Sequence, residues 1–283
     1  MKTRAALLAA AALAAGACVP YPQGGPAGTD ESAAGPAVTQ ASFAPLDAGA
    51  SQVDSLHFSV HAYGDQAANQ ISQAAETDYN NVMMDTNLYS FMPQSGLYQV
   101  YVYADQAEYI KKTGQPEWSG GVAYGNAIYT YMGPQLYPIL AHEMTHVIFY
   151  DYMRYPGGDI NPQHRWVNEG LAVYEEEKAA SGGQGIVDLF PSVRPDMIQN
   201  PIPMDQMISL APATEQAHTV SVWYCEAESL VQFMIEHGGR MGFSQFLAAL
   251  KKGETLDQAV ASGFPGTWSG LAPLYVAWKT SLL

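Results

Sequence analysis

The chain has 283 residues, of which 48% are hydrophobic and 14% are charged, so it can bury one substantial core and is not disordered over most of its length. Its formal net charge of -15 argues against a nucleic-acid partner, because the phosphates would be repelled. Its two cysteines cannot form a disulfide framework, and no internal apolar run reaches the length that a bilayer requires.

The N-terminus has the features of a secretory signal peptide. The positive residues Lys2 and Arg4 come first, followed by the short apolar stretch Ala5–Ala15 and then by small residues. We therefore predict a signal peptide over residues 1–17 and an exported protein.

The end of this segment, Ala15-Gly16-Ala17-Cys18, also resembles the lipobox of bacterial lipoproteins. In that family the cysteine receives a lipid and becomes the new N-terminus. Two outcomes stay open. Lipidation of Cys18 predicts a membrane-anchored lipoprotein of the bacterial cell envelope, facing the periplasm or the cell surface. Ordinary cleavage after Ala17 predicts a secreted protein, and in neither case does the chain meet a membrane except through Cys18.

The sheet-bearing part of the chain is predicted over residues 54–153. Before it, residues 18–53 are rich in Pro, Gly and Ala with few large apolar side chains, which predicts a flexible tether. Alternation of apolar and polar residues predicts strands, and helical spacing predicts helices. In chain order we expect a strand at 56–61, a helix at 65–84, a strand at 98–103, a helix at 105–112, a loop at 113–121, a strand at 127–132 and a helix at 138–153.

The remainder, residues 154–283, is predicted to be helical. The expected helices are 164–180, 215–237, 242–251, 254–261 and 268–281, with only short elements in the Gly- and Pro-rich region 181–213. A sheet-bearing part followed by an all-helical part is an α+β arrangement.

The helix predicted over 138–153 contains His142-Glu143-Met144-Thr145-His146, which matches the pattern His-Glu-x-x-His. Residues four apart lie on one face of a helix, so the two imidazoles can converge on a single cation. Glu143 lies about a quarter of a turn away. It can reach a water on that cation and take its proton as a general base without being a ligand.

A catalytic zinc site needs three protein ligands and one open position. The segment Trp166-Val167-Asn168-Glu169-Gly170-Leu171-Ala172 offers the third ligand, because Glu169 is near the start of the next helix. The intervening turn lets that helix fold back antiparallel and present Glu169 to the histidines. Gly170 has no side chain and would allow close approach of a helix near the metal.

The two linked motifs, His-Glu-x-x-His and the downstream Trp-x-Asn-Glu-Gly-x-Ala, resemble those of the gluzincin metallopeptidases, specifically the bacterial peptidase-MA-like group. The resemblance implies a gluzincin-like fold with an N-terminal mixed sheet, whose edge strand flanks the active-site helix, and an all-helical C-terminal part. It implies one zinc ion per chain, bound by His142, His146 and Glu169, with Glu143 catalytic and a peptide or protein as substrate.

The resemblance also suggests an oxyanion donor. Related aminopeptidases have a tyrosine that hydrogen-bonds the oxyanion in a segment similar to Tyr224-Cys225-Glu226-Ala227, and a phenol is a suitable donor to developing negative charge. Tyr224 is therefore the candidate, with an ordinary core tyrosine as the alternative. His218 is the second candidate donor, although a solvated position is the more common situation for such a histidine.

The remaining histidines are assigned no chemistry. His164, five residues before Glu169, could approach the metal, but a surface position at the start of a helix is expected. His57, His61 and His237 are expected to be structural or exposed. Cys225 is expected to be a small buried apolar side chain.

In the gluzincins an extended peptide binds along an edge strand, and the strand predicted over 127–132 resembles it. Gluzincin aminopeptidases carry Gly-x-Met-Glu-Asn there, and its glutamate holds the free amine of the substrate. This chain has Gly121-Val122-Ala123-Tyr124-Gly125-Asn126, without an acid. The departure favours an endopeptidase.

A second departure concerns the support of the metal ligands. Many gluzincins orient a histidine with an aspartate four residues after the ligand glutamate, a position that is Val173 here. Another carboxylate or a backbone carbonyl is therefore expected to orient the imidazoles. Glu175, Glu176 and Glu177 are candidates for this role, but the solvated face of their helix is the expected position.

Together these features predict a zinc-dependent hydrolase that cleaves peptide bonds with a metal-activated water, an endopeptidase at the cell envelope. The alternative is a zinc-stabilised, lipid-tethered binding or envelope-assembly module with little or no turnover, which the missing aspartate and the open identity of the oxyanion donor favour.

Overall fold

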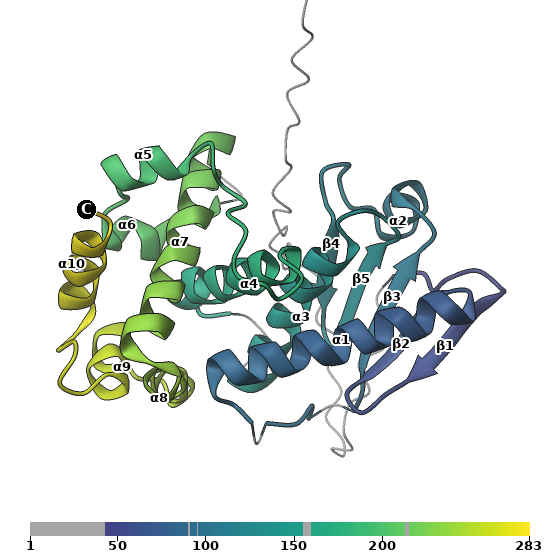
Figure 1. Cartoon of the computed structure of the whole chain (residues 1–283), viewed down its shortest axis with the longest axis horizontal. Helices are drawn as coiled ribbons and strands as arrows, with labels where there is room; N and C mark the ends of the chain where they lie inside the picture. Colours follow the sequence, from purple (N-terminus) through teal and green to yellow (C-terminus); the bar gives the residue numbers. More distant parts are fainter. Residues whose placement is uncertain (1–42, 90, 95, 155–159, 213–214) are drawn as a thin grey trace, which may run out of the picture.

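The computed structural model of the chain describes residues 43–89, 91–94, 96–154, 160–212 and 215–283. The strands are β1 (Ala50–Asp54), β2 (Phe58–Tyr63), β3 (Tyr98–Tyr103), β4 (Gly121–Tyr124) and β5 (Ala127–Tyr131). The helices are α1 (Asp65–Thr86), α2 (Gln106–Thr113), α3 (Leu136–Met153), the short 3-10 helix η2 (Pro162–His164), α4 (Arg165–Ala180), α5 (Arg194–Gln199), α6 (Met204–Ser209), α7 (Ala217–Gly238), α8 (Arg240–Lys251), α9 (Leu256–Gly263) and α10 (Leu271–Ser281). The predicted α+β order, a sheet-bearing part followed by an all-helical part, is confirmed (Figure 1).

The strands form one mixed sheet in the order β1-β2-β3-β5-β4. The inner strands β2, β3 and β5 are parallel, and the outer strands β1 and β4 pair antiparallel with their neighbours. Alternate residues of β2, namely Phe58, Val60 and Ala62, are fully buried on the face that α1 covers, which is why the period-two pattern predicted this strand. The helix α3 completes this core.

The strand at the edge of the sheet is not the one predicted. We expected the edge strand at 127–132, but β5 lies between β3 and β4, and residues 127–130 are all buried. The edge belongs to β4, whose residues were expected in a loop or in the segment that replaces the aminopeptidase motif. Its sequence of small residues, Gly121-Val122-Ala123 before Tyr124, has little strand signal, and only its antiparallel pairing with β5 makes it a strand.

The folded part also begins earlier than the predicted boundary at Asp54. The strand β1 starts at Ala50, and Phe43 packs edge-on against Tyr129 with ring centroids 5.0 Å apart. Tyr103 donates a hydrogen bond of 2.7 Å to the carbonyl of Ala44. The last residues of the predicted tether, 43–53, are thus part of the fold, while the predicted signal peptide, Cys18 and the rest of the tether lie outside the described residues.

In the helical part, α4 is central. It packs between α3 and α7, and twelve consecutive residues, Trp166 to Glu177, are buried. The three glutamates that we expected on a solvated face therefore point in three directions into the protein: Glu175 is 3.2 Å from Lys178, Glu176 contacts His142, and Glu177 accepts the backbone N–H of Leu189. Their exposed fractions are 2%, 8% and 0%.

Several of the buried carboxyl groups in this region resist ionisation. Burial raises the pKa of Glu226 to about 8, and the backbone N–H of Ile202, which donates to Oε2, offsets this only in part. Within the described part of the chain, Oε1 of Glu226 has no hydrogen-bond partner. Burial likewise raises the pKa of Glu228 to about 7 and that of Asp78 to about 7. The folded state therefore holds protons that the unfolded chain releases near pH 4.5.

We expect the protein to lose stability as the pH rises from about 5 to about 8.5. A carboxyl group whose pKa is raised on folding contributes fully below its unfolded pKa, and this contribution is lost as the pH approaches and passes the folded pKa. The check is the thermal unfolding of wild type and Glu226→Gln over this range. The glutamine of the variant cannot ionise, so the Tm of the variant relative to that of wild type should increase as the pH rises. A difference in Tm that does not change with pH would contradict the assignment for Glu226.

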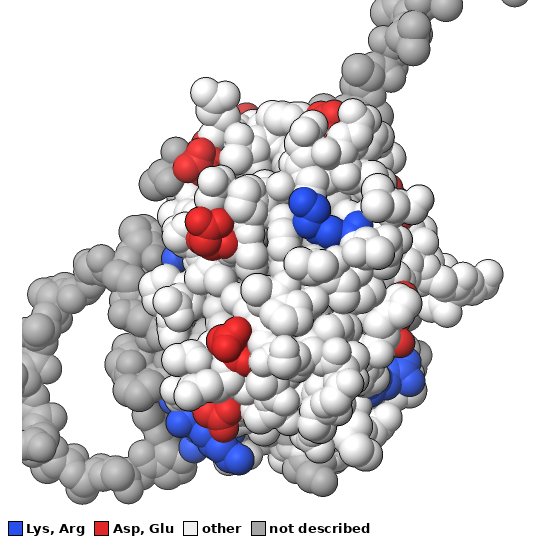
Figure 2. Space-filling view, turned by 90° about the vertical axis from the view of Figure 1, so that its left-hand side faces the viewer, with Lys and Arg blue, Asp and Glu red and all other residues white. Residues whose placement is uncertain are grey.

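Charged side chains are sparse on the surface, as the low fraction of charged residues predicts. Figure 2 shows the end of the molecule that carries the C-terminal helices, and the charged side chains seen there form small, separate groups of both signs. Among the described residues, no helix combines the length and the apolar character needed to cross a bilayer.

Candidate metal centre

The helix that carries the His-Glu-x-x-His pattern is buried on nearly all sides. It lies beside the sheet and α1 in the N-terminal core and packs against α4 on its other side. Thirteen of its eighteen residues are buried, including His142, Glu143 and His146. Polar groups at this depth need partners, so the elements around them decide what they do.

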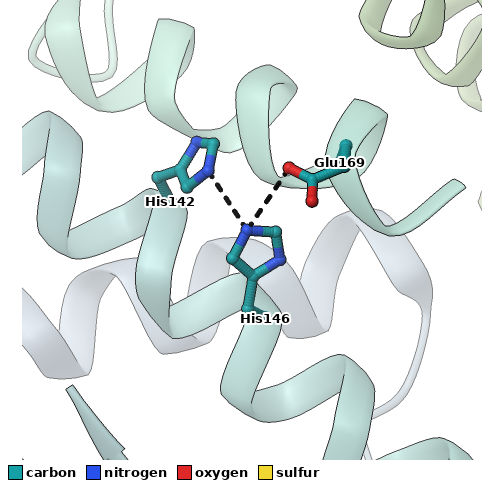
Figure 3. A group of neighbouring side chains, drawn as sticks. All are labelled: His142, His146 and Glu169. Atoms are coloured by element: carbon teal, nitrogen blue, oxygen red, sulfur yellow. Dashed lines mark hydrogen bonds and ion pairs between the residues drawn. The ribbon is translucent and has the colours of Figure 1, made fainter. Parts of the chain in front are cut away.

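His142, His146 and Glu169 point toward one another from α3 and α4 (Figure 3). Nε2 of His142 is 3.1 Å from Nε2 of His146, and the latter is 3.5 Å from Oε2 of Glu169. One ligand atom from each residue lies within 4.8 Å of the other two. The convergence predicted from the helical spacing and from the folding back of α4 is therefore present.

The chemistry of this group fits a divalent cation. Two imidazole nitrogens face each other with a carboxylate beside them, and the buried Oε2 of Glu169 has no hydrogen-bond partner among the described residues. Burial by itself lowers the pKa of His142, but the carboxylates of Glu176, Glu143 and Glu169 outweigh it and raise the pKa to about 9. The pocket thus favours positive charge, which a metal ion would supply in place of the proton.

Glu143 follows His142 in the chain and lines a cavity of about 10 Å³ together with His142 and Glu176. The remaining lining residues are Gly120, Gly121 and Ile139. A cavity of this volume holds about one water molecule. Glu143 thus stands beside both the ligand group and a space of the size of a water.

A family model described as the Peptidase MA superfamily matches residues 92–282, which include β3, β4, β5 and every helix from α2 onward. The chain belongs to the Peptidase MA superfamily. A comparison with curated proteins finds no match. Membership makes the chain a peptidase-type enzyme, a metallopeptidase-like hydrolase. Among the residues that the structure describes, His142, His146 and Glu169 form a buried group that could hold a metal.

The carboxylate that contacts His142 in this peptidase is Glu176, which was expected on a solvated face. Its Oε2 is 2.8 Å from Nδ1 of His142, on the side of the ring away from His146. It takes the place expected for an aspartate at Val173. The signal was available: Glu176 follows Glu169 by seven residues, or two helical turns, so both lie on one face of α4. Three consecutive glutamates concealed it.

We expect Glu176→Ala to weaken metal binding by about 10- to 100-fold, because an unsupported imidazole loses its fixed orientation and part of its basicity. Glu176→Gln should bind more tightly than Glu176→Ala, since its amide oxygen can still accept from Nδ1. Competition with a chromophoric chelator measures the two dissociation constants. Wild-type affinity in Glu176→Ala would show that the contact has no such role.

The other histidines of the peptidase lie outside the metal centre. His164 was expected at the surface, but η2 and the helices around it bury it, and burial lowers the pKa of its ring to about 4. His57 is buried against Glu76, with Nδ1 and Oε2 2.7 Å apart, and is structural as predicted. His218 is exposed as predicted and lies 3.5 Å from Asp196.

Tyr224 lies in α7, in the same core cluster as Trp166 and Leu171 of α4. It is 4% exposed, and its ring meets Trp223 edge-on at 5.2 Å. A donor role toward the metal centre stays a prediction. Cys225 is fully buried, as expected, and burial raises the pKa of its thiol to about 12.

Proposed function

We propose that this peptidase MA chain is a zinc-dependent endopeptidase of the gluzincin type that acts at the cell envelope. The observation that carries the proposal is the convergence of His142, His146 and Glu169 with Glu143 beside them. Two imidazoles and one carboxylate are the donor set of a catalytic zinc site, which keeps a further position open. When bound there, zinc lowers the pKa of a water and polarises the carbonyl of a scissile peptide.

The residues of the chain supply the rest of the chemistry. Glu143 accepts a proton from the attacking water and delivers it to the leaving amine. Glu176 fixes the ring of His142 through Nδ1. Tyr224 donates its phenol hydrogen to the oxygen on which negative charge develops, a role that rests on the resemblance to related aminopeptidases.

The edge strand β4 is the proposed binding site for the substrate backbone. Among the described strands β4 has a neighbour, β5, on one side, and we propose that an extended peptide adds on the other side as a further strand. Its residues, Gly121-Val122-Ala123-Tyr124, include no acid to hold a free amine. A peptide can then extend past the site in both directions, which favours internal cleavage.

The location at the envelope rests on residues 1–18 alone, with the signal peptide and Cys18 as an anchor. Fractionation of cells producing the full chain or Cys18→Ser tests it: the variant should leave the membrane fraction. Equal membrane retention of both proteins would contradict the anchor.

We expect the purified protein to contain one zinc ion per chain and to cleave an unfolded protein such as casein. A chelator should abolish cleavage, and an equimolar amount of zinc should restore it. Elemental analysis and quenched fluorescent peptides give the two readouts. Peptides blocked at both ends should be cleaved as well as free ones if the enzyme is an endopeptidase.

The alternative, a zinc-stabilised binding or assembly module, predicts equimolar zinc and no cleavage. One argument for this module was that Val173 replaces the aspartate that orients a histidine in many gluzincins. Glu176 contacts His142 and can serve in place of that aspartate, which weakens the argument. A protein without zinc would contradict both readings.

A further inference from the structure

The first residue of β4 touches the side chain of Glu143. A Cβ atom placed on Gly121 would lie 2.9 Å from Cγ of Glu143 and 3.2 Å from its Oε1. It would also lie 2.8 Å from Cγ2 of Ile139, which is one helical turn before Glu143 on the same face of α3. Folded proteins do not tolerate carbon atoms this close, so any side chain at Gly121 requires one of these groups to move.

The strand cannot easily be the group that moves. The carbonyl of Gly121 accepts a hydrogen bond of 3.0 Å from Ser119, whose hydroxyl is in turn 2.7 Å from that of Tyr109. Gly121 also pairs with Thr130 of β5, and the hydroxyl of Thr130 donates to the carbonyl of Gly120 at 2.9 Å. These bonds hold the start of β4 from two sides.

The opposing helix is held as well. The helix α3 is buried between the sheet and α4, and Cγ2 of Ile139 is attached to a β-branched carbon with few rotamers. The side chain of Glu143 is unbranched at Cβ and has more rotatable bonds than that of Ile139. A side chain at Gly121 would therefore displace Glu143 and fill part of the water-sized cavity that both residues line.

We propose that Gly121 is a positioning residue for Glu143: the missing side chain lets the carboxylate lie against β4, beside the ligand group and the cavity. The inference rests on the proposed function, in which Glu143 is the general base. It adds a reason why the edge strand begins with glycine, because Gly121 does not have the positive φ that would otherwise require this residue.

The test is Gly121→Ala in the zinc-loaded full chain. We expect kcat to fall by about 100-fold, because a shift of about 1 Å in a catalytic group can cost this much. Zinc content should stay equimolar, KM should change much less than kcat, and the acidic limb of the pH profile of kcat should shift. A loss confined to KM would make Gly121 a substrate contact and overturn the proposal.

Gly120→Ala is the matched control. The three atoms nearest to its Cβ would all belong to Ile139, the closest being the terminal Cδ1 at 2.5 Å, which can rotate away. We expect a clearly smaller loss of kcat than in Gly121→Ala. Equal losses in the two variants would overturn the specific role of Gly121.

A double-mutant cycle with Glu143→Gln separates positioning from general damage. With the base removed, Gly121→Ala should have little further effect on the residual rate; a full 100-fold further loss would overturn the proposal. Should Gly121→Ala not fold, the double variant Gly121→Ala/Ile139→Ala removes the closest contact. Its kcat is then compared with that of Ile139→Ala, with and without Glu143→Gln. Failure of the proposed function would appear earlier, as an inactive wild type.

Discussion

Glu143→Gln is expected to keep the metal and to lower the rate of peptide hydrolysis by at least about 100-fold. Glutamine has nearly the same shape as glutamate and still fits against Gly121, but its amide cannot take a proton from water. The measurement is cleavage of a quenched peptide by wild type and variant, with zinc content determined on the same samples. Zinc content matters because Glu143 is one of the carboxylates that favour positive charge at His142.

Glu117→Gln is the control for this experiment. It removes the same charge from an exposed position in the loop before β4 and should leave hydrolysis close to that of wild type. If Glu143→Gln cleaved as fast as the control, the base would have been assigned wrongly. If it lost zinc together with activity, the change would report on the metal site and not on proton transfer.

The second large effect is expected for Gly170→Ala. A Cβ on Gly170 would lie 2.3 Å from the carbonyl oxygen of Ala227 and 2.6 Å from its carbonyl carbon. The backbone of α7 therefore occupies the space that a side chain at Gly170 of α4 would need. Helix propensity alone predicts a gain of about 1 kcal/mol for this exchange. The clash is with main chain, which cannot rotate away, and we expect a net loss of about 3 kcal/mol in the free energy of unfolding.

The sign of the change is therefore diagnostic. Denaturant unfolding of the metal-free protein measures it, and Ala179→Gly near the end of α4 gives the propensity of that helix without the clash. Val231→Ala in the Gly170→Ala background removes only the third contact, at 2.9 Å, and should restore little stability. An unchanged or higher stability of Gly170→Ala would show that α4 and α7 can separate freely.

The elements with strong periodicity were predicted from the sequence. The alternation around Phe58 and across Tyr98–Tyr103 marks strands that bury one face completely. The helices α7 to α10 begin and end within a few residues of their predicted limits. In each case one face of the element meets the core, so the local pattern carries the information.

The weak elements were missed for a related reason. The strands β1 and β4 lie at the two edges of the sheet, where few side chains are buried and the apolar pattern is short. The residues of β4 adopt strand geometry because they pair with β5, and Gly121 lies against Ile139 and Glu143 of α3. Neither neighbour is visible in the sequence of β4 itself.

What the sequence alone determined is the candidate metal-binding group His142, His146 and Glu169, with Glu143 as the proposed base. The spacing of His142 and His146 places both rings on one face of a helix whatever surrounds it, and the second motif identifies Glu169. What only the tertiary structure decided is which groups stand around them: Glu176 against His142, and Gly121 against Glu143. Periodicity is a property of neighbours in the chain, whereas burial and contact depend on segments that are far apart in sequence. The helix α4 is an interior helix because α3 and α7 pack against it.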